Sequence, residues 1–228
     1  MTFSSTNLAR RLSGELLGSA FLAATVIGSG IAAQRLSPGD VGIELLENAL
    51  VTGAGLYVLI LVFGPLSGAH FNPVVSLVNA ATGGMSWFAA MLYLPAQVIG
   101  CVIGAVGANV MFSLSTVSIS THHRASGPHL LAEVVATLGL ILVIFALARN
   151  GHHAHTPAAV GAYITAAYFF TSSTSFANPA IAVGRIFSNT FAGIAPASVP
   201  GFVLAELLGG ACGLGLLLYL FPATQEPT

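Results

Sequence analysis

Two Asn-Pro dipeptides, Asn72-Pro73 and Asn178-Pro179, lie about a hundred residues apart in an almost wholly apolar chain. Asn is a favoured helix N-cap and Pro is favoured at the first helical position, so each pair predicts the start of a helix. Helices that cross a membrane normally begin at its surface, whereas these two starts fall inside apolar sequence. Two such starts in corresponding halves of one chain indicate interrupted helices that meet near the middle of a bilayer.

The composition supports a membrane-embedded chain. Hydrophobic residues make up 55% of the 228 residues, charged residues only 6%, and the mean hydropathy is +0.89. Six Arg and no Lys serve the whole chain, which is too few charges to cover a soluble surface. The net charge of −1 provides no basic surface for nucleic acid. The first apolar stretch, 12–33, is too long for a typical signal-peptide core and lacks a convincing cleavage site, so we expect it to be retained.

Six apolar stretches are predicted to span the membrane, and two shorter ones to enter it halfway. Most of the full spans are close to the ~20 residues needed to cross the hydrocarbon, although the fifth is short. The half-spans have about ten residues each, which covers roughly half of that thickness at a helical rise of about 1.5 Å per residue. The full spans are 10–34, 43–64, 86–113, 129–149, 157–172 and 198–222, and the half-spans are 73–82 and 179–189.

The two halves of the chain repeat each other. Glu15 in the first span and Glu133 in the fourth each precede an Asn-Pro pair, and Gln97 and Glu206 each follow one. Three spans per half is an odd number, so the second copy must enter the membrane upside down relative to the first. We therefore expect one all-α domain, residues 1–228, built from inverted repeats at approximately 8–114 and 128–223. A small excess of Arg on one side favours a cytoplasmic amino terminus.

The segment Gly68-Ala69-His70-Phe71-Asn72-Pro73-Val74 and the motif Asn178-Pro179-Ala180, with the repeated glutamates and Gln97, resemble the aquaporin (major intrinsic protein) family. The resemblance covers essentially the full length. It implies six tilted helices and two half-helices in a cell membrane, usually assembled as a homotetramer with one pore per subunit. It also implies a passive channel for small neutral solutes and water, with no catalysis, no cofactor and no bound metal.

The chemistry of the two motifs can also be argued from their residues. Each Asn side chain can cap backbone donors with its carbonyl oxygen while its amide NH₂ points into the lumen. Each half-helix start carries about +0.5 of an elementary charge. Cations and protons are therefore repelled at the centre of the pore, whereas neutral solutes pay little free energy to pass it. Aquaporin-type pores are themselves a known example of selectivity by pore diameter, lining groups and half-helix dipoles.

The expected constriction departs from the family pattern. Water- and glycerol-selective members place an Arg directly after the second Asn-Pro-Ala, where this chain has Ile181. Counting residues from the two Asn assigns the other filter positions to Thr52, Ala166 and Ser175. This quartet contains neither an aromatic ring nor a guanidinium, so we expect a wide, weakly polar neck. Family members with an aliphatic residue at the Arg position resemble bacterial channels associated with arsenic resistance.

A wide neck suits compact uncharged solutes such as glycerol, urea, and the neutral metalloid hydroxides arsenite and antimonite. One alternative is an ordinary water channel with an atypical filter. A second, less supported, is an ion-coupled secondary transporter, which can also use broken helices at the midplane. However, no carboxylate lies close in sequence to either Asn. An intramembrane metalloenzyme is the weakest alternative, because the chain has no HExxH-type arrangement.

The remaining polar residues receive supporting roles. Glu15 and Glu133 are expected to accept backbone hydrogen bonds in the re-entrant loops and so to hold the half-helices. His70 is expected to line the cytoplasmic vestibule. Arg185, near the outer mouth, either supplies part of the missing positive charge or anchors the half-helix by snorkelling. The histidine cluster at 152–155 favours a solvated loop over a metal site or a pH gate.

Overall fold

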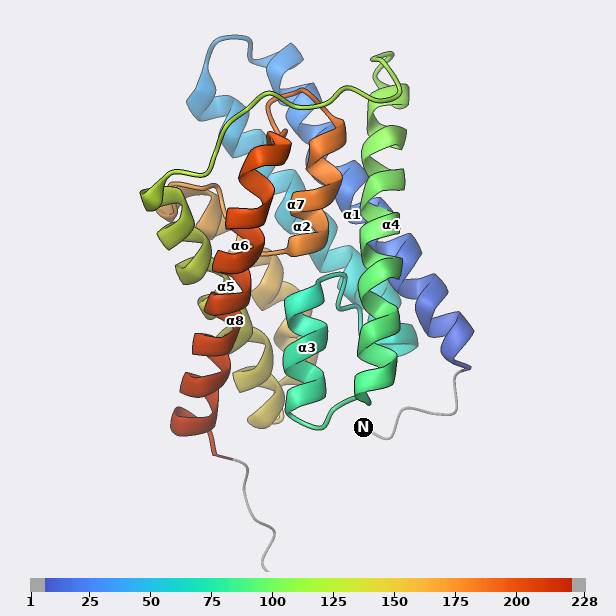
Figure 1. Cartoon of the computed structure of the whole chain (residues 1–228), viewed down its shortest axis with the longest axis vertical. Helices are drawn as coiled ribbons and strands as arrows, with labels where there is room; N and C mark the ends of the chain where they lie inside the picture. The colour runs from blue at the N-terminus through green and yellow to red at the C-terminus, as the bar shows by residue number, and fades with distance from the viewer. Residues whose placement is uncertain (1–6, 223–228) are drawn as a thin grey trace, which may run out of the picture.

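The computed structural model describes residues 7–222, and its regular structure in that range is helical. Figure 1 shows the helices arranged as an upright bundle. The long helices are α1 (Leu8–Leu36), α2 (Val41–Ser67), α4 (Trp87–Met111), α5 (Gly127–Arg149) and α8 (Val199–Leu220). The shorter ones are α3 (Pro73–Ala81), α6 (Thr156–Phe170) and α7 (Pro179–Gly184), with single 3₁₀ turns η1 (His153–His155), η2 (Arg185–Phe187) and η3 (Pro196–Ser198).

Side-chain caps mark where several helices begin. The carboxylate of Asp40 accepts a hydrogen bond from the backbone N–H of Ile43 at 3.1 Å at the start of α2. The Ser86 hydroxyl accepts from the backbone N–H of Ala89 at 3.2 Å at the start of α4. Such caps satisfy backbone donors that the helix itself leaves unpaired. The starts are therefore decided locally, and they lie within a few residues of the predicted spans.

The second half-helix is shorter than the predicted span 179–189. Helix α7 ends at Gly184 and continues only as the turn η2 to Phe187. The carbonyl oxygens of η2 accept hydrogen bonds from distant loop residues instead of from the next helical turn. The donors are the backbone N–H groups of Ser118, Ser120 and Ile194. Because these carbonyls are already paired with the loops, the helix does not extend further.

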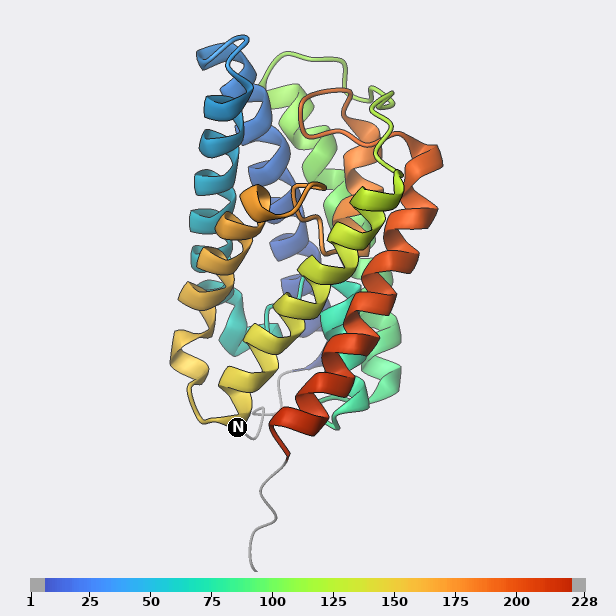
Figure 2. The same cartoon turned by 90° about the vertical axis from the view of Figure 1, so that its left-hand side faces the viewer.

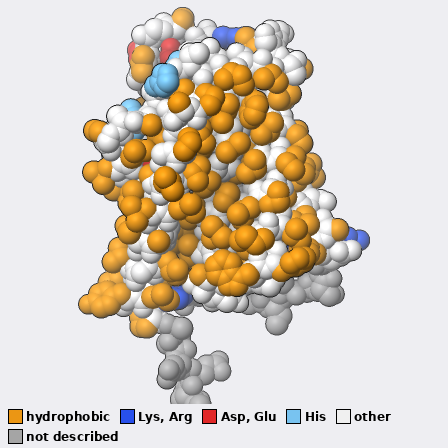
Figure 3. Space-filling view, viewed as in Figure 1, with side chains coloured by type: hydrophobic (Ala, Val, Ile, Leu, Met, Phe, Trp, Pro, Cys, Tyr) orange, Lys and Arg blue, Asp and Glu red, His pale blue; other side chains and the backbone are white. Residues whose placement is uncertain are grey.

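The outside of the bundle is apolar. Five helical segments of the described chain are long and apolar enough to cross a membrane: α1, α2, α4, α5 and Pro196–Leu220. Helix α6, with 15 residues, is shorter, as expected for the fifth span. Hydrophobic side chains cover the middle of the face shown in Figure 3. A surface of this kind belongs in lipid, so the chain is a multi-pass membrane protein.

Close packing of the long helices depends on glycine. At Gly100 on α4, an added Cβ would lie 2.3 Å from the carbonyl oxygen of Leu16 on α1. At Gly209 on α8, it would lie 2.5 Å from the carbonyl oxygen of Val134 on α5. Small residues let helix backbones approach closely where lipid supplies no hydrophobic driving force. Matching positions in the two halves thus create matching helix crossings, α1 with α4 and α5 with α8.

The half-helices α3 and α7 enter the bundle from opposite ends. In Figures 1 and 2 the two short helices run away from each other, and their first residues meet near the middle of the bundle. The long helices surround this meeting point. The arrangement confirms the predicted fold class, six membrane helices and two re-entrant half-helices in an inverted repeat. It also brings Asn72 and Asn178 together although they are far apart in sequence.

Candidate pore

Each Asn of the two motifs caps its own half-helix. The Oδ1 atom of Asn72 accepts a hydrogen bond from the backbone N–H of Val74 at 2.9 Å. The Oδ1 atom of Asn178 accepts from the backbone N–H of Ala180 at 3.0 Å. Pro73 and Pro179, which directly follow the two Asn residues, occupy the first helical position, where a backbone N–H is not needed. This geometry is the one expected from the Asn-Pro pairs.

The two Asn side chains are also tied to each other's loops. The Nδ2 of Asn72 donates to the carbonyl oxygen of Ala177 at 2.7 Å, and the Nδ2 of Asn178 donates to the carbonyl oxygen of Phe71 at 2.8 Å. An amide NH₂ has two donor hydrogens. Each Asn therefore spends one hydrogen on the opposite loop, which fixes its direction, and retains the other for a passing oxygen atom.

The loops before the motifs have the same unusual backbone. Ala69 and Phe71 in the first loop have φ of 50°, and Ser175 and Ala177 in the second have φ of 49° and 47°. These are the positions three and one before each Asn. Left-handed conformations of residues other than glycine cost on the order of 1–3 kcal/mol each and tend to cluster at functional sites. Both loops must therefore be held in place by their surroundings.

Buried carboxyl groups hold the loops. Glu15 accepts hydrogen bonds from the backbone N–H groups of His70 and Phe71 at 3.0 and 2.7 Å. Glu133 accepts from those of Phe176 and Ala177 at 2.9 and 2.7 Å. Both carboxyl groups thus have the contacts predicted for them from sequence.

The sequence pairs Glu206 with Gln97 through the repeat but predicts no role for it. In the structure its Oε1 accepts from the backbone N–H of Asn178 at 3.0 Å. The corresponding Gln97 donates to Glu15 at 2.8 Å. The repeat relationship was the signal that could have assigned Glu206 to loop support.

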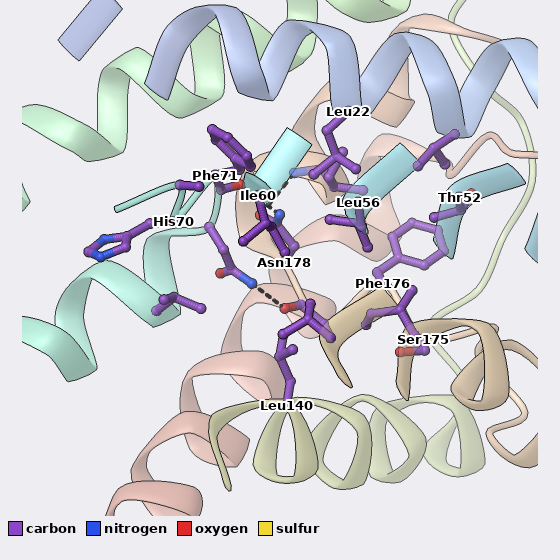
Figure 4. A pocket seen from close by; sticks show the side chains of 18 of the residues that line it. Leu22, Thr52, Leu56, Ile60, His70, Phe71, Leu140, Ser175, Phe176 and Asn178 are labelled. Carbon is purple, nitrogen blue, oxygen red and sulfur yellow. Dashed lines mark hydrogen bonds between the residues drawn. The ribbon is translucent and has the colours of Figure 1, made fainter. Parts of the chain in front are cut away.

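A cavity passes the meeting point of the half-helices. The space in it open to the centre of a water molecule is about 70 Å³, where about 10–15 Å³ on this measure holds one water. Figure 4 shows His70 toward one end of the cavity, Asn178 near the middle, and Thr52 with Ser175 toward the other end. We call these the His70 end and the Thr52 end. The cavity is large enough for several waters in file or for one small polyol.

The Thr52 end contains three of the four residues predicted for the filter. Thr52, Ser175 and Ile181 line the cavity, whereas Ala166 does not and is exposed on the outside of α6. Tyr168 lines it instead, and its hydroxyl lies 3.2 Å from the hydroxyl of Thr52. The assignment of Ala166 is therefore wrong. Counting back from Asn178 places this filter position two residues too early in the chain. Two residues correspond to a rotation of about 200° around a helix, so the counted residue lies on nearly the opposite face from Tyr168.

Arg185 also lies in this cavity. Its side chain is 2% exposed, lines the cavity, and stacks on the ring of Phe176 with 3.4 Å between Cζ and the ring centroid. A snorkelling anchor would reach the membrane surface, so that interpretation of Arg185 is wrong. The expectation of a neck with neither an aromatic ring nor a guanidinium is also wrong, because Tyr168 and Arg185 supply both. Sequence reasoning missed Tyr168 and Phe176, since neither occupies a counted filter position.

His70 is held at its end of the cavity by polar neighbours. Its Nδ1 lies 3.0 Å from the hydroxyl of Ser76, and its Nε2 lies 3.2 Å from Nδ2 of Asn79. Both partners belong to α3. The imidazole is thus fixed beside the first half-helix at one end of the cavity. The histidines at 152–155 lie in a different place, at η1 and the start of α6.

Comparisons with known proteins agree with this geometry. Residues 2–177 match the major intrinsic protein family. The chain is 48% identical over 214 residues to aquaglyceroporin AqpS of Rhizobium meliloti (strain 1021), covering 94% of this chain and 91% of the relative. It is 31% identical over 240 residues to the lens fiber major intrinsic protein of Rattus norvegicus, with 95% and 83% covered.

The fold is also that of a solved structure. The aquaglyceroporin from Plasmodium falciparum is similar with a TM-score of 0.71, over 92% of this chain and 96% of that one, at 19% identity. Opposed half-helices, Asn caps that meet at their tips, and a family match over most of the length lead to one conclusion. The chain belongs to the major intrinsic protein family.

Proposed function

We propose that the chain is a passive channel for small uncharged solutes, which conducts water, compact polyols such as glycerol, and the neutral metalloid hydroxides arsenite and antimonite. Its similarity to a protein named as an aquaglyceroporin supports a channel for water and glycerol-type solutes. The observation that carries the proposal is the composition of the cavity wall around Asn72 and Asn178.

The wall is apolar except for a thin line of hydrogen-bonding groups. Its apolar members include Leu22, Val26, Leu56, Ile60, Leu140 and Ile164. Beside them lie the free amide hydrogens of Asn72 and Asn178, the hydroxyls of Thr52 and Tyr168, and the guanidinium of Arg185. A cation entering this space would lose its hydration shell at a large desolvation cost, because the amide and guanidinium donors cannot replace its ligands. A neutral solute can place its carbon atoms against the apolar side chains and its hydroxyls against the hydrogen-bonding groups.

The carboxyl groups favour passive conduction over ion-coupled transport. Among the described residues, the cavity is lined by no Asp or Glu. Glu15, Glu133 and Glu206 lie behind the loops, and their oxygens accept hydrogen bonds from backbone N–H groups. A coupling-ion site would need carboxylate oxygens that face the solute path. The flux should therefore follow the solute gradient alone.

Two features of the Thr52 end favour different principal solutes. Ile181 contributes an apolar wall at the position where water- and glycerol-selective relatives are expected to have Arg, which favours bulkier hydroxylated solutes such as metalloid hydroxides. Tyr168 and Arg185 narrow the same end and favour the second candidate, a water channel with an atypical filter. The two candidates differ in their ratio of solute flux to water flux.

Stopped-flow light scattering of vesicles that contain the protein measures this ratio for water, glycerol and arsenite. Ile181→Arg places a second guanidinium at the neck and should lower glycerol and arsenite flux severalfold while sparing some water flow. Ala197→Arg is the matched control, because Ala197 is exposed outside the cavity. Unchanged solute uptake in Ile181→Arg would defeat the polyol and metalloid proposal. Water flux without solute flux in the unaltered protein would establish the second candidate.

We further propose that the chain is a single channel domain, residues 1–228 with repeats at approximately 8–114 and 128–223, in a cell membrane with its amino terminus in the cytoplasm. Arg10, Arg11 and Arg149 on one side of the membrane against Arg35 and Arg124 on the other support this orientation. Assembly as a homotetramer follows from the family resemblance. Native mass spectrometry of the detergent-solubilised protein tests the assembly.

A further inference from the structure

Arg185 is a buried guanidinium with unused donors. Its Nε donates to the carbonyl oxygen of Ala192, and its plane lies on the ring of Phe176. Within residues 7–222, its two terminal nitrogens have no hydrogen-bond partner and its charge forms no ion pair. A guanidinium carries five N–H donors. Four of them are therefore available on a side chain that is 2% exposed and lines the cavity.

Three hydroxyl groups line the same end of the cavity. The hydroxyl of Ser175 is buried and has no partner in the described chain. Those of Thr52 and Tyr168 pair with each other at 3.2 Å, and either can donate. Guanidinium donors require acceptor oxygens, and hydroxyls both donate and accept. Arg185 and the three hydroxyls together therefore match a solute that carries several oxygen atoms, at least one of which is a good hydrogen-bond acceptor.

Arg185 is the arginine that lines the cavity. Arg124 lies near the same Phe176 ring, with Cζ 5.5 Å from its centroid. However, Arg124 does not line the cavity and donates to the carbonyl oxygens of Gly193 and Phe191.

Each half-helix tip carries about +0.5 of an elementary charge, but a carboxyl group lies directly behind each tip and accepts from the residues before it. Glu133 and Glu206 also influence Arg185 electrostatically, but they accept hydrogen bonds from backbone N–H groups of the loop and do not line the cavity. Among residues 7–222, no carboxylate thus lines the cavity beside the guanidinium.

We propose that Arg185, held by Phe176 and Ala192, is the principal barrier to cations in this channel and binds acceptor oxygens of neutral solutes at the Thr52 end. The proposal rests on the proposed channel function. It assigns specificity to a residue one helical turn beyond Ile181. Phe176 fixes the plane of the guanidinium, so its terminal nitrogens meet the solute without reorganising.

The test compares urea with guanidinium, which have the same planar shape but differ in charge, by uptake of the labelled compounds into vesicles. Arg185→Gln removes the charge and retains a donor for Ala192, and Arg185→Lys retains the charge. We expect Arg185→Gln to raise the guanidinium-to-urea uptake ratio at least about tenfold, equivalent to about 1.4 kcal/mol. Arg185→Lys should leave cations excluded. If both variants keep the low ratio of the unaltered protein, Arg185 only anchors the loop and the inference is overturned.

A second variant leaves Arg185 in place. Ile181→Glu puts a carboxylate four residues before Arg185, a spacing that pairs on a helix face, and should also raise the ratio. Ile181→Gln is its uncharged control and should keep cations excluded. An equal rise in Ile181→Glu and Ile181→Gln would contradict a role for charge. If the unaltered protein passes neither water nor urea, the channel function itself fails, whereas normal neutral flux with no response to charge overturns this inference alone.

Discussion

Glu206 offers a sharp test of how the second half-helix is held. It is fully buried, and its Oε1 accepts the backbone N–H of Asn178, the residue that caps α7. Glu206→Leu keeps the approximate shape of the side chain and leaves that N–H buried without a partner. An unsatisfied buried donor costs about 1–3 kcal/mol. We expect a loss of stability of this size and a fall in solute flux as Asn178 loses its fixed direction.

Glu206→Gln should behave differently. The Oε2 of Glu206 has no donor within the described chain, and Glu133 is its side-chain neighbour. A buried oxygen without a donor costs free energy. A Gln amide in its place can donate a hydrogen bond, as Gln97 donates to Glu15 in the first half. Stability and flux of Glu206→Gln should therefore stay close to those of the unaltered protein.

Thermal unfolding in detergent and stopped-flow flux measure both variants, with Gln97→Glu as the reciprocal change in the first half. Equal damage from the Leu and Gln variants would show that the carboxyl group itself is required. An undamaged Glu206→Leu would refute the view that this hydrogen bond positions Asn178.

Two further predictions concern packing and the neck. Gly104→Ala should destabilise the protein by about 1–3 kcal/mol through overpacking against Ala20. Gly107→Ala on the same helix should be neutral or slightly stabilising, because its added Cβ meets nothing within 4 Å. Thermal unfolding compares the two variants, and equal effects would contradict the close α1–α4 contact. Tyr168→Ala should widen the neck and raise the flux of erythritol relative to glycerol, while the exposed Ala166→Leu should leave that ratio unchanged, and the reverse result would restore Ala166 to the filter.

Much of the fold could be predicted because its signals are local. The caps at Asn72 and Asn178 join each side chain to a backbone N–H two residues away, so the dipeptides alone predict the helix starts. Apolar length predicts the membrane helices, and an odd number of them per repeat requires inversion of the second half. The glutamates could be predicted to hold the re-entrant loops because a buried carboxyl group must find donors.

The neck could not be predicted in the same way. Which face of α6 meets the cavity depends on the length of the connection between Tyr168 and Asn178, and an error of two residues replaces Tyr168 with Ala166. The direction of Arg185 depends on Phe176, from the loop before the motif, and on Ala192, from the loop after it. No local pattern around Arg185 contains either partner.

The sequence by itself determined that two capped half-helices meet inside an apolar bundle, because capping and apolar length act over a few residues. Only the tertiary structure decided which side chains face the solute. A guanidinium can point outward to lipid headgroups or inward to a cavity, and the choice depends on how the loops before and after the half-helix fold back on it. In this protein the contacts with those loops turn Arg185 inward.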